Sequence, residues 1–152
     1  MKLAEALIGR ADKNKRIELV RQRLLRNAKV QEGEKPAEDP TSLMEELERL
    51  TRELEGLIRR INRTNSVTEF EKGVSLSDAL ATRDVLLLKH GIYLQLAQAG
   101  TVVHDIRTKS EVRFKSTVTV SEIQERADRL AQAHRELDTR IQEMNWLTEL
   151  RD

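Results

Sequence analysis

The sequence predicts a mainly α protein, in which long antiparallel helices form a four-helix bundle or coiled-coil hairpins, with one or two small β-hairpins. Three observations support this fold class. Charged residues make up 35% of the chain and aromatic residues only 3%, and its 152 residues include 6 glycines and 2 prolines. Leucines also recur at spacings of three and four, which places them along one side of a helix. A chain of this length is expected to form a single helical domain over residues 1–152.

The first helix is expected over residues 2–28, because its apolar side chains share one stripe. These residues are Leu3, Leu7, Ile17, Leu24 and Ala28. Asn14 lies on the same stripe and has two interpretations. It is either a buried asparagine that fixes register or oligomeric state in a coiled coil, or an asparagine at the edge of the seam. A polar connection over residues 29–40 follows, in which glycine and proline interrupt any helix.

A second helix is expected over residues 42–62. Two signals for its start differ by a few residues: Asp39 before Pro40 at the first helical position, and Ser42 with Glu45 as a capping box. Its seam is an unbroken heptad pattern. The seam consists of Leu43, Leu47, Leu50, Leu54, Leu57 and Ile61.

Turn-forming side chains are expected to end this helix near residue 62. They are Asn62, Thr64, Asn65 and Ser66. A small β-hairpin is then expected over residues 68–76, with Gly73 supplying the positive φ angle of its turn.

A third helix is expected over residues 76–99 and a fourth over residues 120–149. The stripe of the third is widened by Leu86 and Leu88, so this helix is expected to be the most buried. That stripe consists of Leu76, Leu80, Leu87, Leu94 and Ala97. The fourth helix carries another heptad seam. The seam consists of Ile123, Ala127, Leu130, His134, Leu137, Ile141 and Met144.

The seams of the second and fourth helices are narrow, which is typical of coiled-coil pairing. A single four-helix bundle usually requires wider apolar faces. We therefore expect a homo-oligomer. The sequence leaves open whether the helical hairpins pair within one chain or between chains, and it allows a further protein partner.

Residues 101–118 change from a helical period to an alternating one, which predicts a second β-hairpin with one apolar face. The alternating apolar positions are Val102, His104 and Ile106 on one side of the turn, and Val112, Phe114, Ser116 and Val118 on the other. The second segment is long enough for a membrane strand. Because Ser116 interrupts its apolar face, we expect it to pack on helices or on a neighbouring chain instead, and we expect no membrane partner.

The residue types argue against an enzyme and predict no catalytic, cofactor-binding or metal-binding residue. The chain has no cysteine, so thiolate catalysis and thiolate metal sites are excluded. It contains neither a Gly-x-Ser-x-Gly elbow nor a glycine-rich phosphate loop. None of His90, His104 and His134 has a carboxylate three residues before it, as the histidines of helical di-iron sites have. A metal site shared between subunits across an oligomer axis is left as an alternative.

Two further features have alternative interpretations. Residues 9–29 contain eight basic and two acidic residues, and a basic helix can bind phosphates. Because the net charge of the chain is only +1, we expect pairing within or between subunits to absorb this charge and no nucleic-acid partner. Trp146 either caps the core at the end of the last seam or anchors an interface.

Four stretches of the chain together resemble a known family. They are RNAKVQEGE at residues 26–34, RINRTN at residues 60–65, SEVRF at residues 110–114, and LDTRIQ at residues 137–142 with Asn145 and Trp146. They are similar to septicolysin-like proteins, a family of small, uncharacterised bacterial helical proteins. This resemblance implies a membrane-active, pore-forming protein, and it transfers no functional residue. This function and nucleic-acid binding through the basic first helix are the two alternatives to a structural or interaction protein.

The function expected from the sequence is therefore that of a non-enzymatic structural or interaction protein that forms an oligomeric helical scaffold. Its first residues contain only a short apolar stretch interrupted by Glu5, unlike a signal peptide. The expected location is the cytoplasm.

Overall fold

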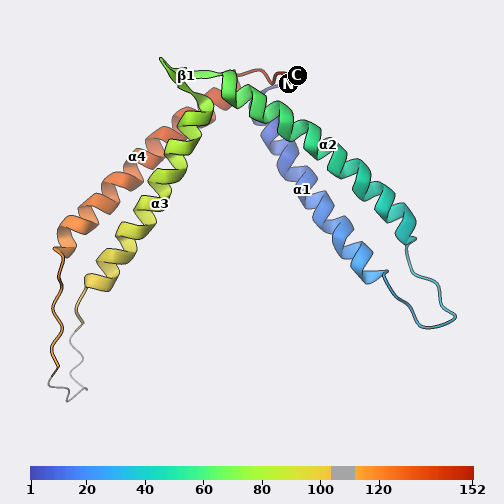
Figure 1. Ribbon diagram of the computed structural model, residues 1–152, viewed down its shortest axis with the longest axis horizontal. Helices are drawn as coiled ribbons and strands as arrows, with labels where there is room; N and C mark the ends of the chain where they lie inside the picture. Colours follow the sequence, from blue (N-terminus) through green and yellow to red (C-terminus); the bar gives the residue numbers. More distant parts are fainter. Residues whose placement is uncertain (104–111) are drawn as a thin grey trace. The chain divides into compact units, whose positions relative to one another are not determined.

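The computed structural model describes residues 1–103 and 112–152. The elements follow the chain as α1 (Leu3–Arg26), α2 (Pro40–Val67), β1 (Glu69–Glu71), β2 (Val74–Ser75), α3 (Leu76–Gly100) and α4 (Val120–Leu147) (Figure 1). The mainly α fold class with a small antiparallel hairpin is confirmed. The chain divides into two compact units. The first unit is Met1–Ser75 with Glu143–Asp152, and the second is Leu76–Gln142.

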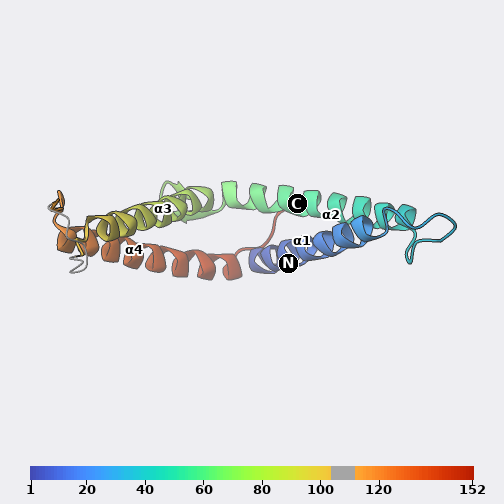
Figure 2. The ribbon, with the colours of Figure 1, turned by 90° about the horizontal axis from the view of Figure 1, so that it is seen from below.

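In the first unit, α1 and α2 lie side by side and antiparallel (Figures 1 and 2). Lys13 Nζ lies 2.6 Å from a carboxylate oxygen of Glu53. Further along α1, an Arg23 nitrogen lies 3.6 Å from a carboxylate oxygen of Glu46. The residue number therefore rises along α1 as it falls along the facing side of α2, as in a helical hairpin.

The predicted heptad seam of α2 faces the core. Leu43, Leu50 and Ile61 are buried, and the remaining seam leucines are half-buried. The stripe of α1 is less regular than expected, because Ala6 and Val20 are buried while Ala28 is exposed. Asn14 is exposed, so it does not fix the register of α1 against α2 from a buried position, and its role in an oligomer stays a prediction. The buried side of α1 therefore includes residues outside the predicted stripe and leaves out its last residue.

Of the two possible starts for α2, the earlier one is correct. Pro40 is the first helical residue and Asp39 is the N-cap. The Asp39 carboxylate accepts a hydrogen bond of 3.1 Å from the backbone N–H of Thr41 and another of 3.1 Å from the hydroxyl of Ser42. Proline suits this position because the first helical N–H has no acceptor within the helix.

The expected end of α2 near residue 62 is wrong, because the helix continues to Val67. The hydroxyl groups that favour turns are instead bonded within the helix. Thr64 donates to the carbonyl of Arg60 at 2.8 Å, and Ser66 donates to the carbonyl of Arg63 at 2.8 Å. Hydroxyl side chains that bond back to the preceding turn are compatible with helix. The β1–β2 hairpin follows where it was predicted, and Gly73 has a φ of 77°.

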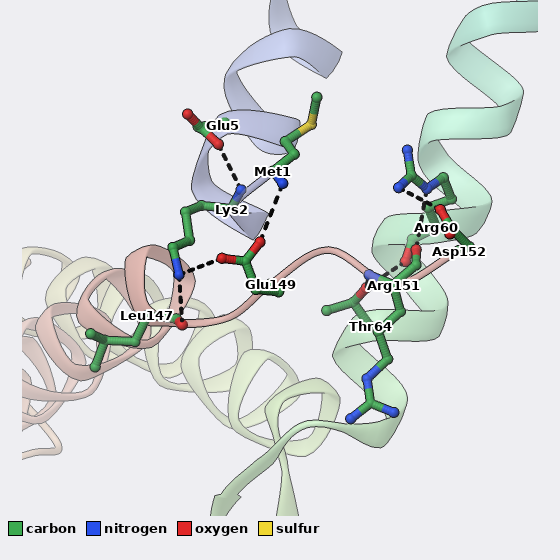
Figure 3. A network of polar contacts seen from close by, with 9 residues as sticks. All are labelled: Met1, Lys2, Glu5, Arg60, Thr64, Leu147, Glu149, Arg151 and Asp152. Atoms are coloured by element: carbon green, nitrogen blue, oxygen red, sulfur yellow. Dashed lines mark hydrogen bonds and ion pairs between the residues drawn. The ribbon is translucent and has the colours of Figure 1, made fainter.

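The C-terminal segment joins the start of α1 to the end of α2 (Figure 3). At α1, the backbone N–H of Leu3 donates to the carbonyl of Thr148 at 2.9 Å, and that of Leu150 donates to the carbonyl of Met1 at 2.8 Å. At α2, the backbone N–H of Arg151 donates to the Thr64 hydroxyl at 2.9 Å. Thr64 is completely buried. The C-terminal segment thus provides a hydrogen-bond donor for the buried Thr64 hydroxyl near the end of α2.

The ion pair of Glu149 adds to this junction. Lys2 Nζ lies 2.6 Å from one carboxylate oxygen of Glu149, and the Met1 amine lies 3.2 Å from the other (Figure 3). The hydrogen bond from Lys2, followed by that from the amine, lowers the pKa of Glu149 below its ordinary value of 4.5. A lowered pKa in the folded state means that the pair stabilises the fold above about pH 4.5 and that this contribution is lost as the pH falls through the folded pKa.

We therefore expect Glu149→Gln to reduce stability at pH 7 and to have less effect as the pH approaches 3. Urea denaturation followed by circular dichroism at pH 7, 4 and 3 measures the difference between the two proteins. Glu48→Gln is the control, because Glu48 is exposed and has no ion pair among the described residues. A difference for Glu149→Gln that stays constant from pH 7 to pH 3 would contradict this assignment.

In the second unit, α3 and α4 lie side by side in both views (Figures 1 and 2). A guanidinium nitrogen of Arg83 lies 2.9 Å from a carboxylate oxygen of Asp138. Near the other end, the guanidinium carbon of Arg126 lies 5.8 Å from the centre of the Tyr93 ring. These contacts make the two helices antiparallel. Several residues of the predicted α4 seam are buried or half-buried, and Ala127 is completely buried.

The expectation that α3 is the most buried helix is wrong. Its buried residues are Leu76, Ala79 and Ala97. Leu87 and Leu88, which were assigned to the buried stripe, are 55% and 62% exposed. The reason is geometric. The apolar residues of α3 extend around most of the helix, whereas the other helix of this hairpin covers only one side.

The second expected hairpin, over residues 101–118, does not form in its described parts. Residues 101–103 and 112–118 contain no strand, and residues 104–111, including His104, lie outside the described residues. Val112 and Phe114 are 67% and 78% exposed. The Ser116 hydroxyl donates to the carbonyl of Val118 at 2.8 Å and accepts from its N–H at 3.3 Å, which turns the backbone locally. An isolated two-stranded hairpin that packs against no other element is only marginally stable in water.

Candidate functional site

The side of α3 that faces away from α4 is an uncovered apolar surface among the described residues of the second unit. Val85, Leu88 and Ile92 are 52%, 62% and 55% exposed. Together with three smaller or polar residues they form a series spaced by 4, 3, 4, 3 and 4 residues, which we call the α3 stripe. The α3 stripe consists of Ala81, Val85, Leu88, Ile92, Gln95 and Ala99. Such spacing places all six residues along one line of the helix.

The α3 stripe arises because the sequence of this helix is apolar in two directions. Ala79 and Ala97 lie on the buried side, where the helix packs in its hairpin. Half a turn away, Leu88 and Ile92 point outward with more than half of their surface exposed. A helix that is apolar all round is usually buried in a larger assembly. Within the described residues of the second unit, the outer side of α3 has no such cover.

Charge is nearly absent along this surface. Between residues 85 and 100, Lys89 is the only side chain with a formal charge. It is exposed and forms no ion pair with any described residue. Asp84, at the other flank of the stripe, has a side chain that is 74% exposed, and its contact with the Arg83 guanidinium is 3.6 Å long. The surface is therefore an apolar line with one acidic and one basic flank.

The histidines provide no arrangement that resembles a metal site in the described residues. His90 and His134 are half-buried. Residues 1–103 and 112–152 contain no group of three or more histidine, aspartate or glutamate side chains that could hold a metal ion. His104 lies outside these ranges. The prediction that no residue binds a metal or cofactor stays a prediction.

The basic segment over residues 9–29 is partly neutralised inside the first unit. Arg23 forms a bidentate hydrogen-bonded pair with Glu38, and this bond lowers the pKa of Glu38. Lys13 likewise lowers the pKa of Glu53, with Arg49 adding to the effect. Arg21 is paired with Glu18 on the same helix at 2.8 Å. The pairing within the chain that the sequence analysis expected is therefore present for three of the eight basic residues. The other five basic residues form no ion pair among the described residues.

Trp146 is 53% exposed and the neighbouring Leu147 is 67% exposed. The interpretation of Trp146 as a residue that caps the core is therefore wrong. Its role as an interface anchor stays a prediction.

Comparisons with known proteins place this chain in a family. A model described as a family of unknown function, DUF6847, matches residues 10–150. The chain belongs to the DUF6847 family. A functionally unknown conserved protein from Corynebacterium diphtheriae, known from its crystal structure, is 48% identical to it, with a TM-score of 0.94 over 99% of each chain. No curated protein matches.

The DUF6847 assignment supports part of the expected family resemblance. The chain is similar to uncharacterised bacterial proteins, as expected, but these matches give no support to a septicolysin-like relationship. Both descriptions leave the function unknown. Across residues 1–103 and 112–152, no helix combines the length and the apolar character that a membrane crossing requires. Neither description assigns a functional residue to this DUF6847 protein.

The sequence analysis missed the α3 stripe, although a signal for it was present. Leu87 and Leu88 were grouped with Leu80 and Leu94 as one wide buried face. The regular spacing of three and four residues through Val85, Leu88 and Ile92 is a separate seam. Two seams on one helix indicate two packing partners.

Proposed function

We propose that this protein is a non-enzymatic helical scaffold that forms a homo-oligomer through the α3 stripe. The observation that supports the proposal is the exposure of Val85, Leu88 and Ile92 on one line of a long helix. Removal of apolar surface from water is the main favourable contribution to most protein association. A contiguous apolar patch on a protein surface is therefore a sign of an interaction site.

The non-enzymatic part of the proposal rests on the residues near this surface. Apart from the amide of Gln95, the α3 stripe bears hydrocarbon side chains with single charges at its flanks. Among the described residues, no pair of titratable groups there is placed for acid–base chemistry. An interaction surface needs shape and apolar area, which a long rigid helix provides. A homo-oligomer is the simplest assembly, because every copy presents the same stripe.

Light scattering on a sizing column over a hundredfold concentration range tests this proposal. The wild-type protein is expected to elute as a discrete oligomer, and Leu88→Asp is expected to shift the mass to that of a monomer. Leu19→Asp is the matched control, because Leu19 is a leucine that is 58% exposed on α1, close to the 62% of Leu88. It should leave the mass unchanged.

Two results would overturn the proposal. The first is a wild-type protein that stays monomeric at every concentration. The second is equal loss of the oligomer in both leucine variants, because this would show a general effect of added charge. Dye release from liposomes at micromolar protein would instead favour the membrane-active function that the septicolysin-like resemblance implies.

A further inference from the structure

The residues of the α3 stripe match one kind of coiled-coil partner. If its spacing is written as a heptad, Val85, Ile92 and Ala99 occupy position a, whereas Ala81, Leu88 and Gln95 occupy position d. The three large side chains thus place β-branched residues at a and leucine at d. Among parallel coiled coils, this combination favours two strands over three or four.

The charges at the flanks of the stripe indicate the orientation of the pair, which is parallel. In this heptad, Asp84 occupies position g and Lys89 occupies position e five residues later. In a parallel, in-register pair, each g residue lies beside the e residue that follows it on the other helix, and opposite charges there set partner and orientation. Two copies of α3 would therefore form two symmetric ion pairs between Asp84 of one copy and Lys89 of the other.

The contacts within one chain leave both groups available for such pairs. Lys89 has no ion-pair partner among the described residues. Asp84 is 74% exposed, and the Arg83 guanidinium that lies 3.6 Å away is bound more closely, at 2.9 Å, to Asp138. An antiparallel pair would place g beside g and e beside e, so neither charge would meet its opposite.

We propose that two copies of this protein associate through a parallel, in-register coiled coil of their α3 helices, with the Asp84–Lys89 pairs on both sides of the seam. This inference rests on the proposed self-association and adds its partner helix, orientation and charges. The seam extends from Ala81 to Ala99, 19 residues or about 28 Å at 1.5 Å per residue. Its two halves are related by a twofold axis, which closes the assembly as a dimer.

Charge reversal tests the ion pairs. Asp84→Lys alone and Lys89→Asp alone each replace two attractive contacts of the dimer with two repulsive ones. Each variant is expected to raise the dissociation constant of its own dimer about tenfold. An equimolar mixture of the two variants restores both attractive contacts between unlike chains. It should therefore form a heterodimer with near wild-type affinity, detected by light scattering and by native mass spectrometry.

Cysteine cross-linking tests the orientation, and the absence of native cysteine makes its result simple to read. Ala99→Cys places two thiols across a parallel seam within reach of a disulfide, for which the Cα atoms must lie about 4.4–6.8 Å apart. In an antiparallel pair centred on Leu88 and Ile92, the same two thiols would be separated by about 27 Å along the helix. We expect Ala99→Cys and Ala81→Cys each to cross-link with itself in mild oxidant. The two variants mixed should give almost no mixed disulfide, because residues 81 and 99 of opposite copies would be about 27 Å apart along a parallel pair.

The outcomes separate this inference from the proposed function. A monomeric wild-type protein overturns both. A dimer that Leu88→Asp dissociates, but in which only the mixed sample of Ala81→Cys and Ala99→Cys cross-links, keeps the proposed function and overturns the parallel coiled coil. Failure of the charge-reversed mixture to associate more tightly than each variant alone also overturns the parallel coiled coil. Circular dichroism of every variant should match the wild type, and a folded dimer with self-linked Ala99→Cys supports the inference.

Discussion

Leu50→Ala is expected to lower the free energy of unfolding by about 2–5 kcal/mol, because it removes a buried leucine side chain from the centre of the α2 seam. Leu50 is 1% exposed, and it lies between the buried Leu43 and Ile61. The substitution loses the transfer free energy of three carbon atoms and leaves a cavity that the helix pair fills only in part. Urea denaturation followed by circular dichroism measures the change.

Leu54→Ala is the matched comparison for Leu50→Ala. Both are leucines of the same seam, but Leu54 is only half-buried, so its replacement should cost clearly less. A change below about 0.5 kcal/mol for Leu50→Ala, the range of ordinary surface substitutions, would show that this seam is not part of the core.

Thr64→Val is expected to lower the free energy of unfolding by about 1–3 kcal/mol, the cost of leaving a buried polar group unpaired. Thr64 is completely buried, and its hydroxyl accepts a hydrogen bond of 2.9 Å from the backbone N–H of Arg151. Valine has nearly the same shape as threonine, so the packing is kept while the acceptor is lost. Chemical denaturation measures the loss. Hydrogen exchange should also show faster exchange at the N–H of Arg151.

Thr51→Val is the control for the Thr64 substitution. Thr51 lies on the same helix, and its hydroxyl also donates to the carbonyl four residues earlier, at 2.9 Å, but the residue is exposed. Its replacement should change stability by less than about 0.5 kcal/mol. Equal effects at the two positions would mean that the contact of Thr64 with the C-terminal segment does not stabilise the fold.

The two units differ in how their helix pairs are closed. The C-terminal segment closes the first unit with hydrogen bonds to both α1 and α2. The second unit has a pair of helices and no comparable closing segment among its described residues. The apolar side of α3 is uncovered because the apolar residues of this helix extend around most of its surface while its hairpin partner packs against one side; we propose that a second copy of the same helix covers it.

The sequence by itself determined the four helices and the hairpin. The heptad through Leu43, Leu50 and Ile61 could be predicted because its 4-3 spacing is a local property of the helix, independent of its partner. The same holds for the cap at Asp39 and for Gly73, whose φ of 77° suits a residue without a Cβ atom. These features depend on residues that are close together along the chain.

Only the tertiary structure decided which apolar surfaces are covered and which polar groups are bonded. The spacing of Leu87 and Leu88 could not show that the one helix packed against α3 covers only one side of it, so the α3 stripe was mistaken for core. Thr64 was expected to end a helix, yet the N–H of Arg151, 87 residues away in the chain, gives its hydroxyl a buried partner. The segment around Phe114 has the alternation of a strand, but the Phe114 side chain is not buried against any described element, and the residue is 78% exposed. Burial depends on partners distant in sequence, and local periodicity carries no information about them.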